Sequence, residues 1–445
     1  MWWSRLVAER LVRPIFTLYS FYKFVKNQRV MYGYATCCLC TKIPHEKFQP
    51  SVSCANTQFP LAKGSSVKTE YCTRTQSSDS APKPKVGEIR ALTGLRGVAA
   101  TDVALLHIGG VAPLSLFAFH NQAVDIFFCL SGFTLSLAYR IESARQLNWK
   151  AFLAARFARV YPLCAIALIL CTIYSAFWNL NNFSAYGPIE FIGDFVRQLL
   201  MINALPVIGS SVHWIAPMWS LSIEAFCYVA IFPILFAITM PAGSLSPKWR
   251  LAIILVLSGF TYAFYVLFMN PGVYSHLVPP ATGPWIHWVA IVRGICMFTC
   301  GWLVYTLYTN APAILNGAIE MVDIVVLVAA LILVGRMFGV VDVALIVPLA
   351  PFLVLGISSG DSLTSRILSG KTLHYLGKIS YSLYILHWPV KELYDLLGGS
   401  SQPEIRLAAI FIASLALSGL SYSYLETPMR MYLFKKITQK LSKHG

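Results

Sequence analysis

Arg96 and His107 are the two residues whose types and spacing best support chemistry in this sequence. They lie eleven positions apart in an apolar stretch. On a helix, eleven residues make about three turns, so both side chains share one face about 16 Å apart along the axis. A hydrocarbon core is about 30 Å thick, so His107 would lie near mid-membrane if Arg96 lay at the surface. Because an ionisable group at that depth is costly, it is a functional candidate.

The composition places these residues in a membrane protein. Hydrophobic residues make up 57% of the 445 residues and charged residues only 12%, whereas soluble proteins have about 25% charged residues. The apolar runs predict an all-α fold, a polytopic transmembrane bundle of about ten helices. The expected spans are 93–112, 122–139, 160–178, 217–239, 251–269, 285–308, 322–338, 343–358, 376–397 and 405–425.

The ends of the chain differ from this bundle. Residues 1–87 are basic and contain five cysteines, and we expect a flexible leader that is disordered or lies on the membrane surface. Residues 88–432 form the expected membrane domain, and 433–445 form a basic cytoplasmic tail. The cysteine cluster of the leader lacks a second ligand pair, so no metal is expected.

Lysine and arginine in the short loops predict the orientation. Basic residues concentrate at 140–159, 248–250 and 366–371 and in the C-terminal tail, which all fall on one side if ten helices alternate. The positive-inside rule names that side the cytoplasm. We therefore expect an integral protein of the plasma or inner membrane with both termini cytoplasmic, and no nucleic-acid partner.

Further polar residues lie on the expected spans. Asp125 lies near the start of the second span, in line with small residues. These could form a packing seam, although the carboxylate of Asp125 needs a partner. Glu224 lies inside the fourth span, where lipid contact is costly. Tyr384 and His387 belong to a polar stripe on the ninth span. His387 would reach the depth of His107, so the two histidines could bracket a reaction centre or simply cross-link helices.

Arg156 and Arg159 precede the third span at i and i+3 spacing. Two guanidinium groups on neighbouring faces of one helical turn suit phosphate groups, because each can form paired hydrogen bonds to oxyanions. The alternative is an ordinary positive anchor at the membrane surface.

In order, these segments resemble the acyltransferase-3 family of integral membrane O-acyltransferases, and the resemblance covers about 88–432. Six matching segments carry it: Gly-Leu-Arg96 followed by His107, Asp125-Ile-Phe-Phe-Cys-Leu-Ser-Gly-Phe133, Arg156-Phe-Ala-Arg159-Val-Tyr-Pro, Trp219-Ser-Leu-Ser-Ile-Glu224, Leu376-Gly-Lys-Ile-Ser-Tyr-Ser-Leu-Tyr-Ile-Leu-His387 and Leu425-Glu-Thr-Pro428.

The resemblance implies transfer of an acyl group, commonly acetyl, from cytoplasmic acyl-CoA to a hydroxyl of a carbohydrate, lipid-linked glycan or other envelope molecule. It implies that Arg96 and His107 are the essential pair and that Arg156 and Arg159 hold the phosphates of the coenzyme A co-substrate. We expect the remaining candidates to bind the acceptor or to support the reacting groups; these are Asp125, Glu224, Tyr384 and His387.

Two questions stay open at the level of sequence. His107 could withdraw the proton of the acceptor hydroxyl as a general base, or it could accept the acyl group first as a nucleophile. A multi-pass transporter of an acyl group, a glycan or a small molecule is the alternative function, since transporters also bury charged residues near mid-membrane. Transporters often contain inverted repeats with broken helices, and this sequence has no evident internal repeat.

Overall fold

The computed structural model describes most of the chain after residue 87. The described residues are 88–109, 122–141, 147–178, 188–206, 208, 214–242, 245–269, 285–337, 341–400 and 402–442. The chain divides into two units, 1–80 and 81–445, and the described residues all lie in the second. The leader expected over 1–87 therefore lies outside the described residues.

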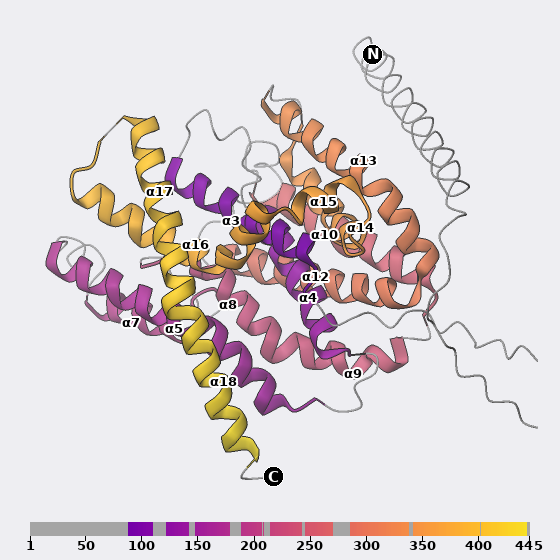
Figure 1. Ribbon diagram of the computed structural model, residues 1–445, viewed down its shortest axis with the longest axis horizontal. Helices are drawn as coiled ribbons and strands as arrows, with labels where there is room; N and C mark the ends of the chain where they lie inside the picture. Colours follow the sequence, from indigo (N-terminus) through magenta and orange to yellow (C-terminus); the bar gives the residue numbers. More distant parts are fainter. Residues whose placement is uncertain are drawn as a thin grey trace, which may run out of the picture. The chain divides into compact units, whose positions relative to one another are not determined.

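Every regular element in the described part of the chain is a helix (Figure 1). In chain order the elements are α3 (Arg90–Gly109), α4 (Gln122–Tyr139), α5 (Trp149–Trp178), α7 (Pro188–Leu199), α8 (Met218–Phe226), η3 (Cys227–Ile231), α9 (Phe232–Ala242), α10 (Pro247–Met269), α12 (Trp285–Asn310), α13 (Pro312–Met337), η4 (Val343–Leu349), α14 (Ala350–Ile357), α15 (Leu363–Leu368), α16 (Lys371–Leu396), α17 (Pro403–Ser421), η5 (Tyr422–Glu426) and α18 (Thr427–Ser442). The expected all-α class is thereby confirmed.

Eight helical segments among the described residues are long and apolar enough to cross a membrane. They are Arg90–Gly109, Gln122–Tyr139, Trp149–Ile173, Met218–Thr239, Pro247–Phe268, His287–Asn310, Pro312–Arg336 and Pro403–Lys436. The other two expected spans are also helical but differ in kind. The segment Val343–Ile357 is shorter than a typical span, and α16 carries the polar stripe that holds His387.

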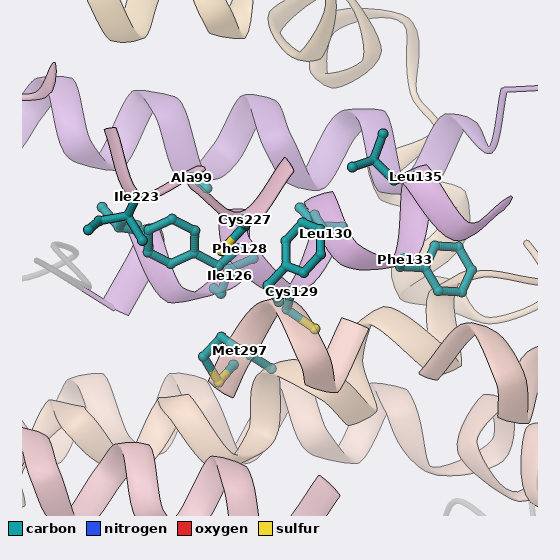
Figure 2. Close-up of a cluster of buried hydrophobic side chains, with 14 of the residues drawn as sticks. Ala99, Ile126, Phe128, Cys129, Leu130, Phe133, Leu135, Ile223, Cys227 and Met297 are labelled. Carbon is teal, nitrogen blue, oxygen red and sulfur yellow. The ribbon is translucent and has the colours of Figure 1, made fainter. Parts of the chain in front are cut away.

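The buried core gathers around α4. Figure 2 shows a part of it in which Phe128 and Cys129 of α4 lie among side chains of other helices, including Ile223 of α8 and Met297 of α12. Most residues of α4 and α12 are buried, whereas few residues of α13 are buried. Helix α13 therefore has the surface expected of a lipid-facing helix, while α4 and α12 form the interior.

Several hydroxyl groups on the apolar helices, Ser136 of α4 and Ser258 of α10 among them, bond to their own helix. Ser136 Oγ donates to the Gly132 carbonyl at 2.7 Å, and Ser258 Oγ donates to the Ile254 carbonyl at 2.7 Å. This one-turn pattern gives a small polar side chain a partner without water, which the hydrocarbon core of a membrane requires.

Two π-helical turns, η3 and η5, interrupt long helices. The turn η3 begins three residues after Glu224, and η5 ends at Glu426. Single π-helical turns often occur at functional sites, because they change the direction in which nearby side chains point. Each turn thus lies beside an acidic residue of a segment that the sequence singled out, Glu224 for η3 and Glu426 for η5.

Candidate functional site

His107 of α3 and His387 of α16 lie in direct contact. His107 Nδ1 is 3.0 Å from His387 Nε2, and the two rings are nearly parallel, with an interplanar angle of 9° and centroids 5.1 Å apart. The edge of Trp388 closes one side of the pair, with its ring centroid 5.6 Å from that of His107. The two histidines that the sequence placed at one depth therefore form a pair, which we call the histidine pair.

Close packing of α3 against α16 brings the pair together. Gly97 lies against the backbone of Gly377, and Gly377 lies against the carbonyl of Thr93. Because contact occurs between Gly97 and Gly377 and again ten residues later between the histidines, the two helices run parallel. Small residues allow helix backbones to approach this closely in membranes.

The two histidines differ in accessibility. His387 is fully buried, with 0% of its surface exposed, and its Nδ1 lies 3.0 Å from the carbonyl oxygen of Leu383. His107 keeps part of its surface exposed. A reacting group is therefore better able to reach His107 than His387.

A small cavity lies toward the Arg96 end of α3. Its volume is about 50 Å³. It is lined by Arg96, Val124, Phe127, Phe128, Ser220, Leu221, Glu224, Ser380, Tyr381 and Tyr384. The structure thus brings three predicted residues, Arg96, Glu224 and Tyr384, to one hollow. We call it the Arg96 cavity.

Glu224 is held by two hydroxyl groups. Ser131 Oγ donates to Glu224 Oε1 at 2.7 Å, and the Tyr228 hydroxyl donates to the same oxygen. Arg96 lies within electrostatic range of Glu224, and its Nε is buried without a hydrogen-bond partner among the described residues. A buried guanidinium nitrogen of this kind can still bind an oxygen atom of a substrate.

Tyr384 connects the Arg96 cavity with the histidine pair. Its hydroxyl lies 2.6 Å from Ser220 Oγ and donates to the Pro217 carbonyl at 3.1 Å. Its ring centroid is 6.3 Å from that of His387. Tyr384 lies one helical turn before His387 on α16, so a wall of the cavity continues directly into the histidine pair.

A second, larger pocket lies between α5 and α18. It has a volume of about 300 Å³ and is lined by Tyr139, Ala155, Arg156, Ala158, Arg159, Arg430, Met431 and Phe434. We call it the arginine pocket. Arg159 is also within electrostatic range of Arg96. Three guanidinium groups around one hollow favour a ligand that carries several negative charges.

Asp125 lies away from both hollows in a buried ion pair. Arg293 of α12 donates to its two carboxylate oxygens at 2.7 and 3.2 Å, and the side chains are 0% and 3% exposed. A paired arrangement of this kind satisfies most of the carboxylate. Asp125 thus has the partner that its position required, and that partner joins α4 to α12.

No three histidine, cysteine, aspartate or glutamate side chains come close enough to hold a metal ion in the part of the chain that the structure describes. The polar groups at the histidine pair and in the Arg96 cavity are hydroxyls, imidazoles, one carboxylate and one guanidinium. This set suits proton transfer and the binding of an acyl or hydroxyl group.

The helical region of this chain matches a known family of acyltransferases in sequence. Residues 89–423 match the family described as an acyltransferase domain, which covers most of the chain. The chain belongs to the acyltransferase-3 family. The predicted resemblance is therefore confirmed, and the helices that carry the histidine pair and the Arg96 cavity lie inside the matched region.

Relatives in the acyltransferase-3 family are distant in sequence. Peptidoglycan O-acetyltransferase OatA of Listeria monocytogenes is 26% identical over 367 residues, which cover 77% of this chain and 56% of the relative. Acyltransferase MdmB of Streptomyces mycarofaciens is 24% identical over 389 residues, which cover 79% of this chain and 94% of the relative. The chain thus matches just over half the length of the Listeria protein. No solved structure matches it.

Sequence reasoning missed three polar partners in this acyltransferase domain. Arg293 is a single arginine within an apolar span and could have been sought as the partner of Asp125. Arg430 follows the Glu426-Thr-Pro segment, and its place in the sequence indicates only a basic residue near the C-terminus. Ser131 lies in the second motif, but no spacing rule joins it to Glu224, because the two residues belong to different helices.

Proposed function

We propose that this protein transfers an acetyl group from acyl-CoA to a hydroxyl group of a carbohydrate acceptor. One observation carries the proposal: the Arg96 cavity, Tyr384 and the histidine pair are adjacent, and Arg159 of the arginine pocket lies within electrostatic range of Arg96. The arginines at one end of this arrangement suit the phosphates of acyl-CoA. The imidazole at the other end suits a reaction at its thioester.

The arginine pocket is the proposed site for the phosphates of coenzyme A. Arg156 and Arg159 lie one turn apart on α5, and Arg430 faces them from α18. Arginine binds phosphate through paired hydrogen bonds, so three arginines can hold several phosphate oxygens. Arg96 would then guide the uncharged arm of the coenzyme from this pocket toward His107.

The Arg96 cavity supports a short acyl group. A cavity needs about 10–15 Å³ of this measure to hold one water molecule, so about 50 Å³ accommodates only a few atoms of that size. An acetyl group contributes three heavy atoms. Phe127 and Phe128 bound the space and would obstruct a longer chain.

His107 would act as the general base. The acceptor O–H bond breaks as its proton moves to His107 and as the acceptor oxygen bonds to the thioester carbon. The carbon–sulfur bond of the resulting tetrahedral intermediate then breaks, and His107 returns the proton to the departing sulfur. The products are an acetyl ester and free coenzyme A, and His107 ends neutral as it began.

Two findings support a carbohydrate acceptor outside the cytoplasm. The Listeria relative is a peptidoglycan O-acetyltransferase by name. The arginine pocket lies among the loops and helix ends that the positive-inside rule assigns to the cytoplasm. His107 lies about 16 Å further along α3 than Arg96, so the donor would enter from the cytoplasmic side and the acceptor from the opposite side. We therefore propose that both termini lie in the cytoplasm and that the protein resides in the plasma or inner membrane.

The proposal is tested by analysing ester-linked acetyl groups. Mass spectrometry of envelope glycans from cells with the protein and from cells lacking it should show acetyl esters that depend on the protein. Membrane vesicles supplied with acetyl-CoA should release coenzyme A thiol at the same time. Acetyl esters that persist unchanged without the protein, together with no thiol release, would contradict the proposed transfer. Movement of label across the membrane without ester formation would instead indicate a transporter.

A further inference from the structure

We infer that His387 is a positioning residue that fixes the proton arrangement of His107, so that Nε2 of His107 is the nitrogen that reacts. This inference rests on the proposed function, because it assigns a particular atom to the proton transfer. It follows from the hydrogen bonds of the histidine pair, from the burial of His387 and from the exposure of His107.

The Leu383 carbonyl determines which nitrogen of His387 carries a hydrogen. His387 Nδ1 lies 3.0 Å from that oxygen. A carbonyl oxygen can only accept a hydrogen bond, so Nδ1 of His387 must carry a hydrogen and donate it. Since Leu383 and His387 lie one turn apart on α16, helix geometry maintains this hydrogen bond.

The other nitrogen of His387, Nε2, carries no hydrogen. The side chain is 0% exposed, and Lys391 on the same helix lies within electrostatic range of it. A second positive charge buried beside a lysine is costly, so His387 is neutral. In a neutral imidazole with a hydrogen on Nδ1, Nε2 carries a lone pair and can only accept.

Because Nε2 of His387 can only accept, it determines which nitrogen of His107 carries a hydrogen. His107 Nδ1 lies 3.0 Å from His387 Nε2 and must donate to it. The neutral form of His107 therefore has its hydrogen on Nδ1 and its lone pair on Nε2. In the part of the chain that the structure describes, the hydrogen bond of the His107 ring is made through Nδ1, and the ring is partly exposed.

The charged groups around the pair leave this arrangement intact. On α16, Lys391 pairs with Glu392 at 2.8 Å and with Asp395 at 3.3 Å. On α17, Arg406 pairs with Asp395 at 2.6 Å and donates to the Ile108 carbonyl, next to His107. The carboxylates of Glu392 and Asp395 thus form ion pairs with Lys391 and Arg406. The hydrogen bond of His107 is made to the imidazole of His387 instead.

The consequence is a defined role in catalysis. Nε2 of His107 takes the proton of the substrate hydroxyl, which makes the His107 ring a cation. Nδ1 of this ring still donates to Nε2 of the neutral His387, so the ring keeps its orientation. The bond between His107 and His387 strengthens as the positive charge forms, since hydrogen bonds from charged donors are stronger. His387 never touches the substrate in this account, and it acts only through His107.

The test uses the full-length protein in membrane vesicles with acetyl-CoA as the probe, and coenzyme A thiol release as the activity. His387→Ala removes the acceptor for His107, and we expect kcat to fall about 100-fold. His387→Gln retains an acceptor oxygen near the position of Nε2, and we expect it to recover activity to within about tenfold of the wild type. His374→Gln, which changes another buried histidine of α16, is the matched control and should leave the activity unchanged.

A spectroscopic measurement separates positioning from folding. Nitrogen NMR of the ¹⁵N-histidine-labelled protein should show Nε2 of His107 without hydrogen in the wild type and a mixture of tautomers in His387→Ala. A wild type in which Nδ1 of His107 lacks the hydrogen would overturn the inference. Full activity of His387→Ala would also overturn it. So would a His387→Gln variant whose activity does not exceed that of a folded His387→Ala variant. Activity that survives His107→Ala would instead overturn the catalytic assignment in the proposed function.

Discussion

Gly97 and Gly377 pack backbone to backbone, and a Cβ atom added to Gly97 would lie 2.6 Å from the Gly377 nitrogen. These two glycines are separated by the same 280 positions as His107 and His387. The parallel packing of α3 and α16 therefore keeps one register from the glycine contact to the histidine pair. The spacing between the helices decides whether the two imidazoles touch.

A bulky residue at Gly97 should separate the histidine pair. Gly97→Val forces α3 away from α16, and we expect activity to fall more than tenfold while overpacking costs about 1–3 kcal/mol of stability. Coenzyme A thiol release and thermal unfolding in detergent measure the two effects. Gly259→Val is the matched control, because a Cβ at Gly259 meets nothing within 4 Å. Wild-type activity in Gly97→Val would show that the contact is dispensable.

The ion pair between Asp125 and Arg293 should be structural. Asp125→Asn leaves a buried guanidinium without its charge partner, and we expect a loss of about 3 kcal/mol in the free energy of unfolding. The double variant Asp125→Asn with Arg293→Gln replaces both charges and should recover most of that loss. Denaturation in detergent gives the coupling energy.

Activity of the same variants decides between packing and acceptor binding at Asp125. We expect the double variant to recover activity together with stability. A stable double variant that remained inactive would show that Asp125 acts on a substrate after all.

Much of the fold was accessible from the sequence, because the membrane makes hydrophobic length a direct signal. Helices occur at all the expected spans, and the domain expected over 88–432 contains the family match. Two details were not accessible. Helix α5 begins at Trp149, eleven residues before the expected span at 160, since a helix can continue through the polar surface of the membrane. Helix α18 likewise continues into the tail expected over 433–445.

The candidate site was predictable along single helices and not between them. Helical spacing placed Arg96 and His107 on one face, and it aligned Tyr384 with His387. The partnership of Asp125 with Arg293, and of Ser131 with Glu224, depends on which helices pack together, and periodicity carries no information on that. Arg430 joined the arginine pocket for the same reason, because α18 packs beside α5.

Arg430 should contribute to the binding of the donor rather than to its reaction. Arg430→Ala removes one charged hydrogen-bond donor, and we expect KM for acetyl-CoA to rise about tenfold, with kcat within twofold of the wild type. Steady-state kinetics at two salt concentrations should show a weaker salt dependence in the variant. Arg366→Ala, an exposed arginine of α15 outside the pocket, is the control. An unchanged KM would remove Arg430 from the donor site.

Phe127 should limit the length of the acyl group. Phe127→Ala enlarges the Arg96 cavity, and we expect the ratio of kcat/KM for butyryl-CoA to that for acetyl-CoA to rise about tenfold. Thiol release with each donor measures this ratio. Phe260→Ala, an exposed phenylalanine of α10, is the control. If the ratio stays constant in Phe127→Ala, the cavity does not hold the acyl group.

The proposed acetyl transfer depends on His107, which takes the proton of the acceptor hydroxyl. The most direct measurement is the transfer of radiolabelled acetyl from acetyl-CoA to alkali-labile esters in membrane glycans, with the wild type compared with His107→Ala at equal amounts of folded protein. We predict that His107→Ala retains less than about 1% of the wild-type rate, in line with the loss of a general base, while His374→Gln retains all of it. If His107→Ala forms labelled esters at the wild-type rate, His107 is not the general base of the reaction.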